Sequence, residues 1–122
     1  MARKQFIMGG GFSAGQVDAL VGTVNSSVSS AGSSISDATA LTSDLNVLST
    51  VTTTQGVQLP AMAPGDEIIV YNDTVTECLV YPPSSSYQIN QISAGSAHIF
   101  PGYTACKYLC VTTTQIVAFQ SS

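Results

Sequence analysis

The sequence predicts an all-β protein, a small sandwich or barrel head that follows a thin N-terminal segment. From residue 37 onward, apolar residues form short runs of strand length that are separated by Pro, Gly and Asn. Short strands at close spacing with turn residues between them are typical of sandwiches and barrels. Before residue 37 the chain is rich in Ser and Gly and its apolar spacing differs. We therefore divide the chain into an arm, residues 1–36, and a head domain, residues 37–122.

The arm begins with two cations and a short apolar cluster. The stretch Phe6-Ile7-Met8 ends at a run of glycines, which is too short for a secretory signal, so we expect synthesis in the cytoplasm. A segment of this composition has no face to bury by itself, and it is either a disordered terminus or an arm that orders when it docks onto a partner. In the second case its anchoring residues would be Arg3, Lys4, Phe6, Ile7 and Phe12.

The next stretch, residues 17–36, has the apolar rhythm of a coiled-coil seam. Spacings of four and three residues alternate along it, and β-branched residues at such positions favour three strands over two. Its many Ser and Gly residues are weak helix formers. The segment is therefore a weak helix held by two other copies, an extended stalk or a flexible linker. In the first two cases the trimer interface is made by Val17, Val21, Val24, Val28 and Ile35.

The head contains eight predicted strands. They cover residues 46–53, 56–59, 67–72, 78–81, 87–89, 97–100, 104–111 and 115–119. Between them lie turn segments such as Pro82-Pro83-Ser84 and Pro101-Gly102. The heptapeptides at residues 51–57 and 111–117 share Val-Thr-Thr-Thr-Gln and end in Val. The two copies are either equivalent strand-turn segments or a coincidence.

Composition and charge exclude several kinds of partner. Charged residues make up 8% of the chain, apolar residues 44%, and the net charge is −4. Nucleic-acid binding depends on neutralising phosphates, and the three cations Arg3, Lys4 and Lys107 form no basic stripe. No apolar run is long enough to cross a membrane. A charge-poor surface fits a protein that is covered by neighbours, and oligomerisation would stabilise so small a core.

The residues with reactive side chains do not form a convincing catalytic pattern. An odd number of cysteines without an export signal indicates buried free thiols at Cys78, Cys106 and Cys110. The Gly11-Phe12-Ser13-Ala14-Gly15 match to a nucleophile elbow lacks the α/β sheet that such an elbow needs. His98 would point to the opposite side of its strand from Ile99, as a structural or interface residue. We expect no enzyme activity, metal or cofactor.

Several landmarks of the head, in order, resemble a small β domain found in tailed-phage virion proteins, both capsid decoration proteins and head or tail fibres. The matching segments are residues 56–60, 64–66, 70–72, 79–83 and 89–90. The sequence departs from that pattern at Ser84-Ser85-Ser86, where glycines are common, and in having no Trp on its last strand. The resemblance implies a jelly-roll-like head that assembles as a homotrimer, with the N-terminal segment attaching it to the virion.

Among these virion proteins, the short stalk favours a capsid decoration protein. Residues 17–36 would span only roughly 30 Å as a helix, too little for a fibre shaft. The expected partners are two further copies of the chain and the major capsid protein, and the expected location is the capsid surface. The alternative is a short fibre or a tip that binds a receptor or a host glycan through Tyr71, Tyr81, Tyr87 and Tyr103.

Overall fold

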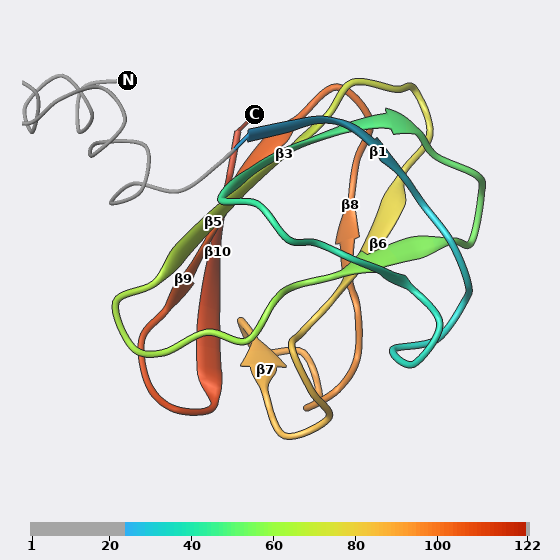
Figure 1. Ribbon diagram of the computed structural model, residues 1–122. Coiled ribbons are helices and arrows are strands. Elements are labelled where there is room, and N and C mark those ends of the chain that lie inside the picture. The colour runs from blue at the N-terminus through green and yellow to red at the C-terminus, as the bar shows by residue number, and fades with distance from the viewer. Residues whose placement is uncertain (1–23, 122) are drawn as a thin grey trace, which may run out of the picture.

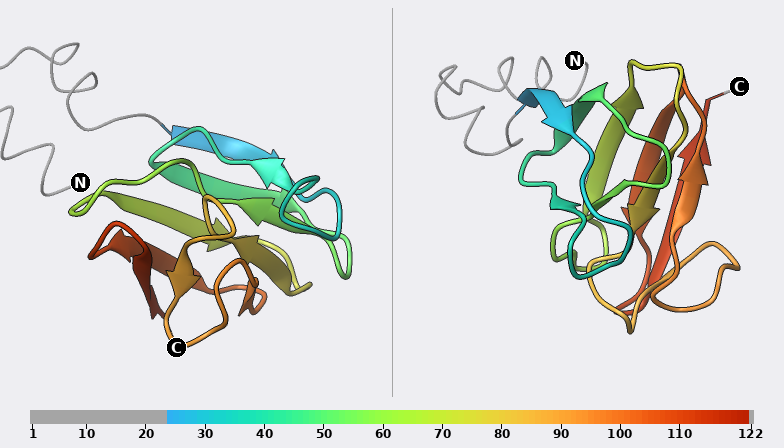
Figure 2. Two further views of the ribbon diagram at one scale, coloured as in Figure 1. Left: turned by 90° about the horizontal axis from the view of Figure 1, so that it is seen from below. Right: turned by 90° about the vertical axis from the view of Figure 1, so that its right-hand side faces the viewer.

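The structure, a computed structural model, describes residues 24–121 and is all-β, with ten strands in two sheets and no helix in that range. Figure 1 shows the two sheets packed as layers, and Figure 2 shows them from two further sides. The strands are β1 (Val24–Ser29), β2 (Thr39–Ala40), β3 (Leu45–Thr50), β4 (Gly56–Gln58), β5 (Glu67–Asn72), β6 (Cys78–Tyr81), β7 (Gln88–Ile89), β8 (His98–Phe100), β9 (Ala105–Cys110) and β10 (Gln115–Gln120).

The all-β prediction is confirmed, and each of the eight predicted strands overlaps an observed one. For β5 and β6 the predicted bounds are the observed bounds. Buried residues alternate with more exposed ones along β5, and three of the four residues of β6 are buried. One face of each strand therefore contacts the core. The sequence pattern missed β2, which has only two residues, and it gave β1 to the arm.

The first six strands wind as a two-sheet β-solenoid. β1, β3 and β5 are neighbours in the six-stranded sheet, whereas β2, β4 and β6 are neighbours in the four-stranded sheet, so the chain alternates between sheets. Every pairing among these six strands is parallel. A jelly roll is built from antiparallel strands in Greek keys. The jelly-roll expectation is therefore wrong for the winding of this chain, because each strand lies beside the strand one coil earlier.

The last four strands close the fold in a different way. β8 adds to β6, β9 adds to β5, and β10 pairs with β9, all antiparallel. β7 then pairs with β10 in parallel at the edge of the six-stranded sheet. The orders are β1-β3-β5-β9-β10-β7 and β2-β4-β6-β8. The six-stranded sheet is thus one continuous surface made from both halves of the sequence.

β1 belongs to the head rather than to a stalk. It pairs with β3 along its length, so residues 24–29 are neither helical nor free of the fold. Val24 faces Leu45, and Val28 faces Leu48, which means that β1 contains one more residue than β3 between these pairs. Such a β-bulge reverses the side on which the following residues point. Val24 is therefore 60% exposed, whereas Val28 is 4% exposed in the core.

The core lies between the two sheets. From the six-stranded sheet it receives Val28, Leu48, Val70, Tyr108 and Ile116, all buried. From the four-stranded sheet it receives Val57, Cys78, Val80 and Phe100, each 0% exposed. Burial of large apolar side chains contributes about 1.5–3 kcal/mol each, which makes this layer the main source of stability.

The repeated Val-Thr-Thr-Thr-Gln segments are both turns that follow a strand. The first joins β3 to β4 and so carries the chain to the other sheet, with Gln55 N–H donating to the Thr52 carbonyl. The second joins β9 to β10 in a hairpin within one sheet, with Gln115 N–H donating to Thr112 Oγ1. The two copies are similar in sequence and local role but lead to different topology.

Candidate functional site

The structure places the predicted interface residues in different surroundings. Val24 is exposed, Val28 is buried inside its own chain, and Ile35 is half-buried in the connection between β1 and β2. Val28 therefore cannot contribute to a seam between copies without leaving the core. The remaining predicted anchor and interface residues lie outside the described part of the chain. These are Arg3, Lys4, Phe6, Ile7, Phe12, Val17 and Val21.

A broader surface, absent from the predictions, is the outer face of the six-stranded sheet, the side that points away from the other sheet. Residues paired across neighbouring strands lie on the same face. One row crosses five strands and consists of Val24, Leu45, Ile69, Lys107 and Phe119. A second row consists of Val47, Tyr71 and Ala105, and a third of Glu67, Leu109 and Val117. We call these three rows the outer face.

The outer face is apolar although it points away from the core. A sheet with one solvated face normally alternates apolar and polar residues along each strand. Here β5 reads Ile68-Ile69-Val70-Tyr71, and β10 reads Ile116-Val117-Ala118-Phe119, with apolar residues on both sides. Phe119 is 53% and Tyr71 36% exposed. Strands that are apolar on both faces are typical of sheets that are covered on both faces.

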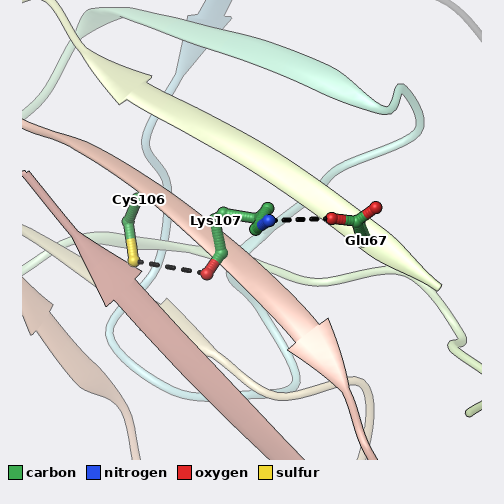
Figure 3. A network of polar contacts seen from close by, with 3 residues as sticks. All are labelled: Glu67, Cys106 and Lys107. Atoms are coloured by element: carbon green, nitrogen blue, oxygen red, sulfur yellow. Dashed lines mark hydrogen bonds and ion pairs between the residues drawn. The ribbon is translucent and has the colours of Figure 1, made fainter. Parts of the chain in front are cut away.

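One ion pair lies in the middle of this surface. Lys107 Nζ of β9 lies 3.0 Å from Glu67 Oε1 of β5. Figure 3 shows the two side chains pointing toward each other from neighbouring strands. Lys107 Nζ also lies 5.6 Å from the centre of the Phe119 ring, a cation–π distance. Cys106 precedes Lys107 on the strand and its thiol is buried on the other side. Lys107 thus contacts Glu67 of β5 on one side and the Phe119 ring of β10 on the other.

The other charges of the head lie elsewhere. Residues 24–121 contain one lysine and six carboxylates, so this part carries a charge of −5 with His98 neutral. Apart from Glu67, the carboxylates lie in the connections between strands and are exposed, namely Asp37, Asp44, Asp66, Asp73 and Glu77. The outer face, with one charge of each sign, is thus nearly neutral on an acidic molecule.

The reactive side chains of the head lie in or beside the core. His98 Nδ1 lies 2.8 Å from the hydroxyl oxygen of Tyr108, which is 0% exposed. Burial lowers the pKa of His98 and raises the pKa of Tyr108 well above its ordinary value. All three cysteines are buried and free, which confirms the prediction, and burial raises the pKa of Cys78 to about 12. A thiol of that pKa remains protonated at neutral pH and is a poor nucleophile.

The four tyrosines of the glycan hypothesis divide into two pairs. Tyr81 donates its hydroxyl hydrogen to the Ser33 carbonyl at 2.9 Å, and Tyr87 donates to the Met62 carbonyl at 2.9 Å. These two rings therefore fasten loops to the fold. Tyr71 and Tyr103 remain as exposed aromatic side chains, and Tyr71 belongs to the outer face.

A single asparagine organises the loops at the end of β5. Asn72 is fully buried, and its Nδ2 donates to the carbonyls of Thr76 and Pro101. Its Oδ1 accepts from the backbone N–H and the hydroxyl of Thr74. These bonds tie the β5–β6 loop to the β8–β9 loop, and so they fix the end of the strand that carries Tyr71.

No group of three His, Cys, Asp or Glu side chains within residues 24–121 is arranged to hold a metal ion. In the same residues no helix is long and apolar enough to cross a membrane.

No protein-family model matches the chain, and comparisons with curated proteins and with solved structures gave no match. The candidate site is therefore defined by geometry alone, as the outer face of the six-stranded sheet.

Sequence reasoning identified four strands of this face, β3, β5, β9 and β10, but neither β1 nor the face itself. The signal was present as apolar runs without alternation in residues 68–71 and 116–119. Such runs indicate strands that are covered on both sides. Because β5 and β10 are far apart in the sequence, their shared surface emerges only from the pairing of both with β9.

Proposed function

We propose that this protein is a non-enzymatic structural component of a virion, a homotrimeric capsid decoration protein that binds and stabilises a phage head. Two lines of reasoning support the proposal. The landmarks of the head resemble small β domains of tailed-phage virion proteins, and the outer face is an apolar, nearly neutral surface of the kind that an assembled protein covers. The second observation carries the proposal, because an isolated protein with a largely apolar row across five strands of one sheet face would be prone to associate.

Stabilisation would arise by mass action. A protein that binds only the assembled shell lowers the free energy of that state and so raises the temperature at which the shell comes apart. A trimer presents three N-terminal segments, and linkage of three weak contacts raises their combined affinity through effective concentration. In this proposal Arg3, Lys4, Phe6, Ile7 and Phe12 contact the major capsid protein, and the heads cover the shell surface.

The nature of the reactive groups supports a role without catalysis. The histidine has a buried tyrosine as its partner, and burial raises the pKa of all three thiols of the core. General acid–base catalysis needs a titratable group within reach of a substrate. In this proposal these side chains contribute to the packing of the core and have no catalytic role.

The test uses shells of the virion that carries the protein, prepared without it. The purified full chain is added, and bound protein is separated from free protein by sedimentation. We expect binding to the shell and a higher denaturation temperature by calorimetry. Equal denaturation temperatures with and without the protein would contradict the proposal. Binding to host cells or to a glycan array, without binding to shells, would instead support a short fibre or a receptor-binding tip.

A further inference from the structure

We infer that the outer face of the six-stranded sheet binds the same face of further copies of this chain. This inference deepens the proposed function, on which it rests for the identity of the assembly, by assigning the subunit interface to the sheet. The sequence pattern assigned that interface to residues 17–35. The bulge in β1 instead divides Val24 and Val28 between the outer face and the core.

The balance of charge on the outer face identifies another copy as its partner. When identical surfaces meet, both carry the same net charge, and two surfaces of the same charge repel each other. The head as a whole carries −5, yet the outer face pairs Lys107 with Glu67 at 3.0 Å and is nearly neutral. Two such faces can therefore meet without repulsion between net charges on the faces. A basic partner, by contrast, would be drawn to the exposed carboxylates in the loops.

The positions of the aromatic residues fit an interface between subunits. Aromatic side chains dominate the energy of most interfaces. Phe119 lies on β10 and Tyr71 on β5, with Lys107 and Ala105 of the intervening strand β9 between them. Lys107 Nζ lies 5.6 Å from the centre of the Phe119 ring, a contact that favours this position of the ring before any partner binds. An ordered side chain loses less conformational entropy when it is buried.

Exposed apolar residues on other surfaces do not form a continuous row across several strands. Ile99 on β8 is 56% exposed, Val75 lies in the β5–β6 loop, and Val111 follows β9. None of these three belongs to the five-strand row. Ile99 is nevertheless a useful control, because its exposed fraction is close to the 53% of Phe119 and it lies in the other sheet.

The first experiment measures the solution mass of the full chain by light scattering over a concentration series. We expect an oligomer for the unchanged protein. Phe119→Thr, which keeps a strand-forming residue, should weaken association by about tenfold or more, the effect of losing an aromatic anchor. Ile99→Thr should leave the mass unchanged. A monomer at all concentrations, or equal weakening by both substitutions, would overturn the inference.

A charge exchange tests the same surface without removing apolar area. Lys107→Glu places two carboxylates on each face, so copies should repel one another and dissociate. The double change Glu67→Lys with Lys107→Glu restores one charge of each sign and should restore the oligomer. Circular dichroism checks that each variant keeps its strand content. An oligomer that persists in folded Lys107→Glu would show that the sheet face is not the interface.

These results are distinguishable from a failure of the proposed function. Association that depends on Phe119 and Lys107, together with no binding to shells, would leave the interface standing and remove the decoration role. Shell binding by a protein whose mass is insensitive to these substitutions would leave the decoration role standing and remove the interface on the sheet.

Discussion

At the scale of single residues, the pair formed by His98 and Tyr108 illustrates how a polar contact is retained in an apolar layer. The Tyr108 ring fills the core, and its hydroxyl is 2.8 Å from His98 Nδ1. The rings meet edge to face with centroids 5.7 Å apart. A buried hydroxyl without a partner would cost roughly 1–3 kcal/mol. The histidine supplies that partner and becomes partly buried in doing so.

The lowered pKa of His98 predicts a dependence of stability on pH. Burial moves the folded-state pKa below the ordinary 6.5, so the unfolded chain takes up the proton first as the pH falls. The contribution of His98 is therefore complete above pH 6.5 and is lost as the pH falls through the folded pKa. Urea unfolding at a series of pH values should show a decreasing midpoint in this window.

His98→Gln provides the control, because glutamine keeps a hydrogen-bonding side chain but does not titrate. This variant should show a flatter pH dependence below 6.5. The pKa of Asp37 is also lowered, by hydrogen bonds from Ser34, but its contribution is lost below its ordinary 3.8, in a separate range. An unchanged pH profile in His98→Gln would mean that another group causes the dependence.

At the scale of elements, β1 decides where the head begins. Its valines have the four-residue spacing of a coiled-coil seam, and the same spacing in a regular strand would place both on one face. The extra residue in β1 relative to β3 separates them. The first coil of the solenoid therefore covers Leu48 with Val28, both of which belong to the core.

Replacing the two valines one at a time distinguishes a strand from a seam. Val28→Ala should lower the free energy of unfolding by about 2 kcal/mol, because two buried methyl groups are lost from a packed site. Val24→Ala should lower it little, since that side chain is largely exposed. Urea unfolding of dilute protein gives both values. Equal losses from the two substitutions would favour a seam in which both valines are buried between chains.

At the scale of the whole molecule, the sequence predicted the elements better than their arrangement. The strands are local features, and apolar runs bounded by Pro, Gly and Asn identify them well. The solenoid winding depends on which strands pair, and parallel pairing of β1 with β3 or β3 with β5 leaves no distinct mark in either strand alone. The outer face was missed for the same reason, because its rows combine residues as far apart as Val24 and Phe119.

Shortening the chain at two points tests the division of the molecule that the structure gives. Removal of residues 1–23 leaves every described strand intact, so this variant should keep its strand content, its unfolding midpoint and its self-association through the outer face. Removal of residues 1–36 also deletes β1, which exposes the edge of β3 and uncovers Leu48. That variant should unfold at lower urea concentration or aggregate, because an open strand edge invites pairing with other chains.

Light scattering and circular dichroism on the two shortened chains separate the roles of the two parts. An oligomer that survives loss of residues 1–23 would place assembly in the head and leave those residues for attachment to the shell. If loss of residues 1–23 alone gives a folded monomer, those residues hold the copies together and the interface on the sheet is wrong. If loss of residues 1–36 leaves stability unchanged, β1 contributes nothing to the fold, which would contradict the burial of Val28 between the two sheets.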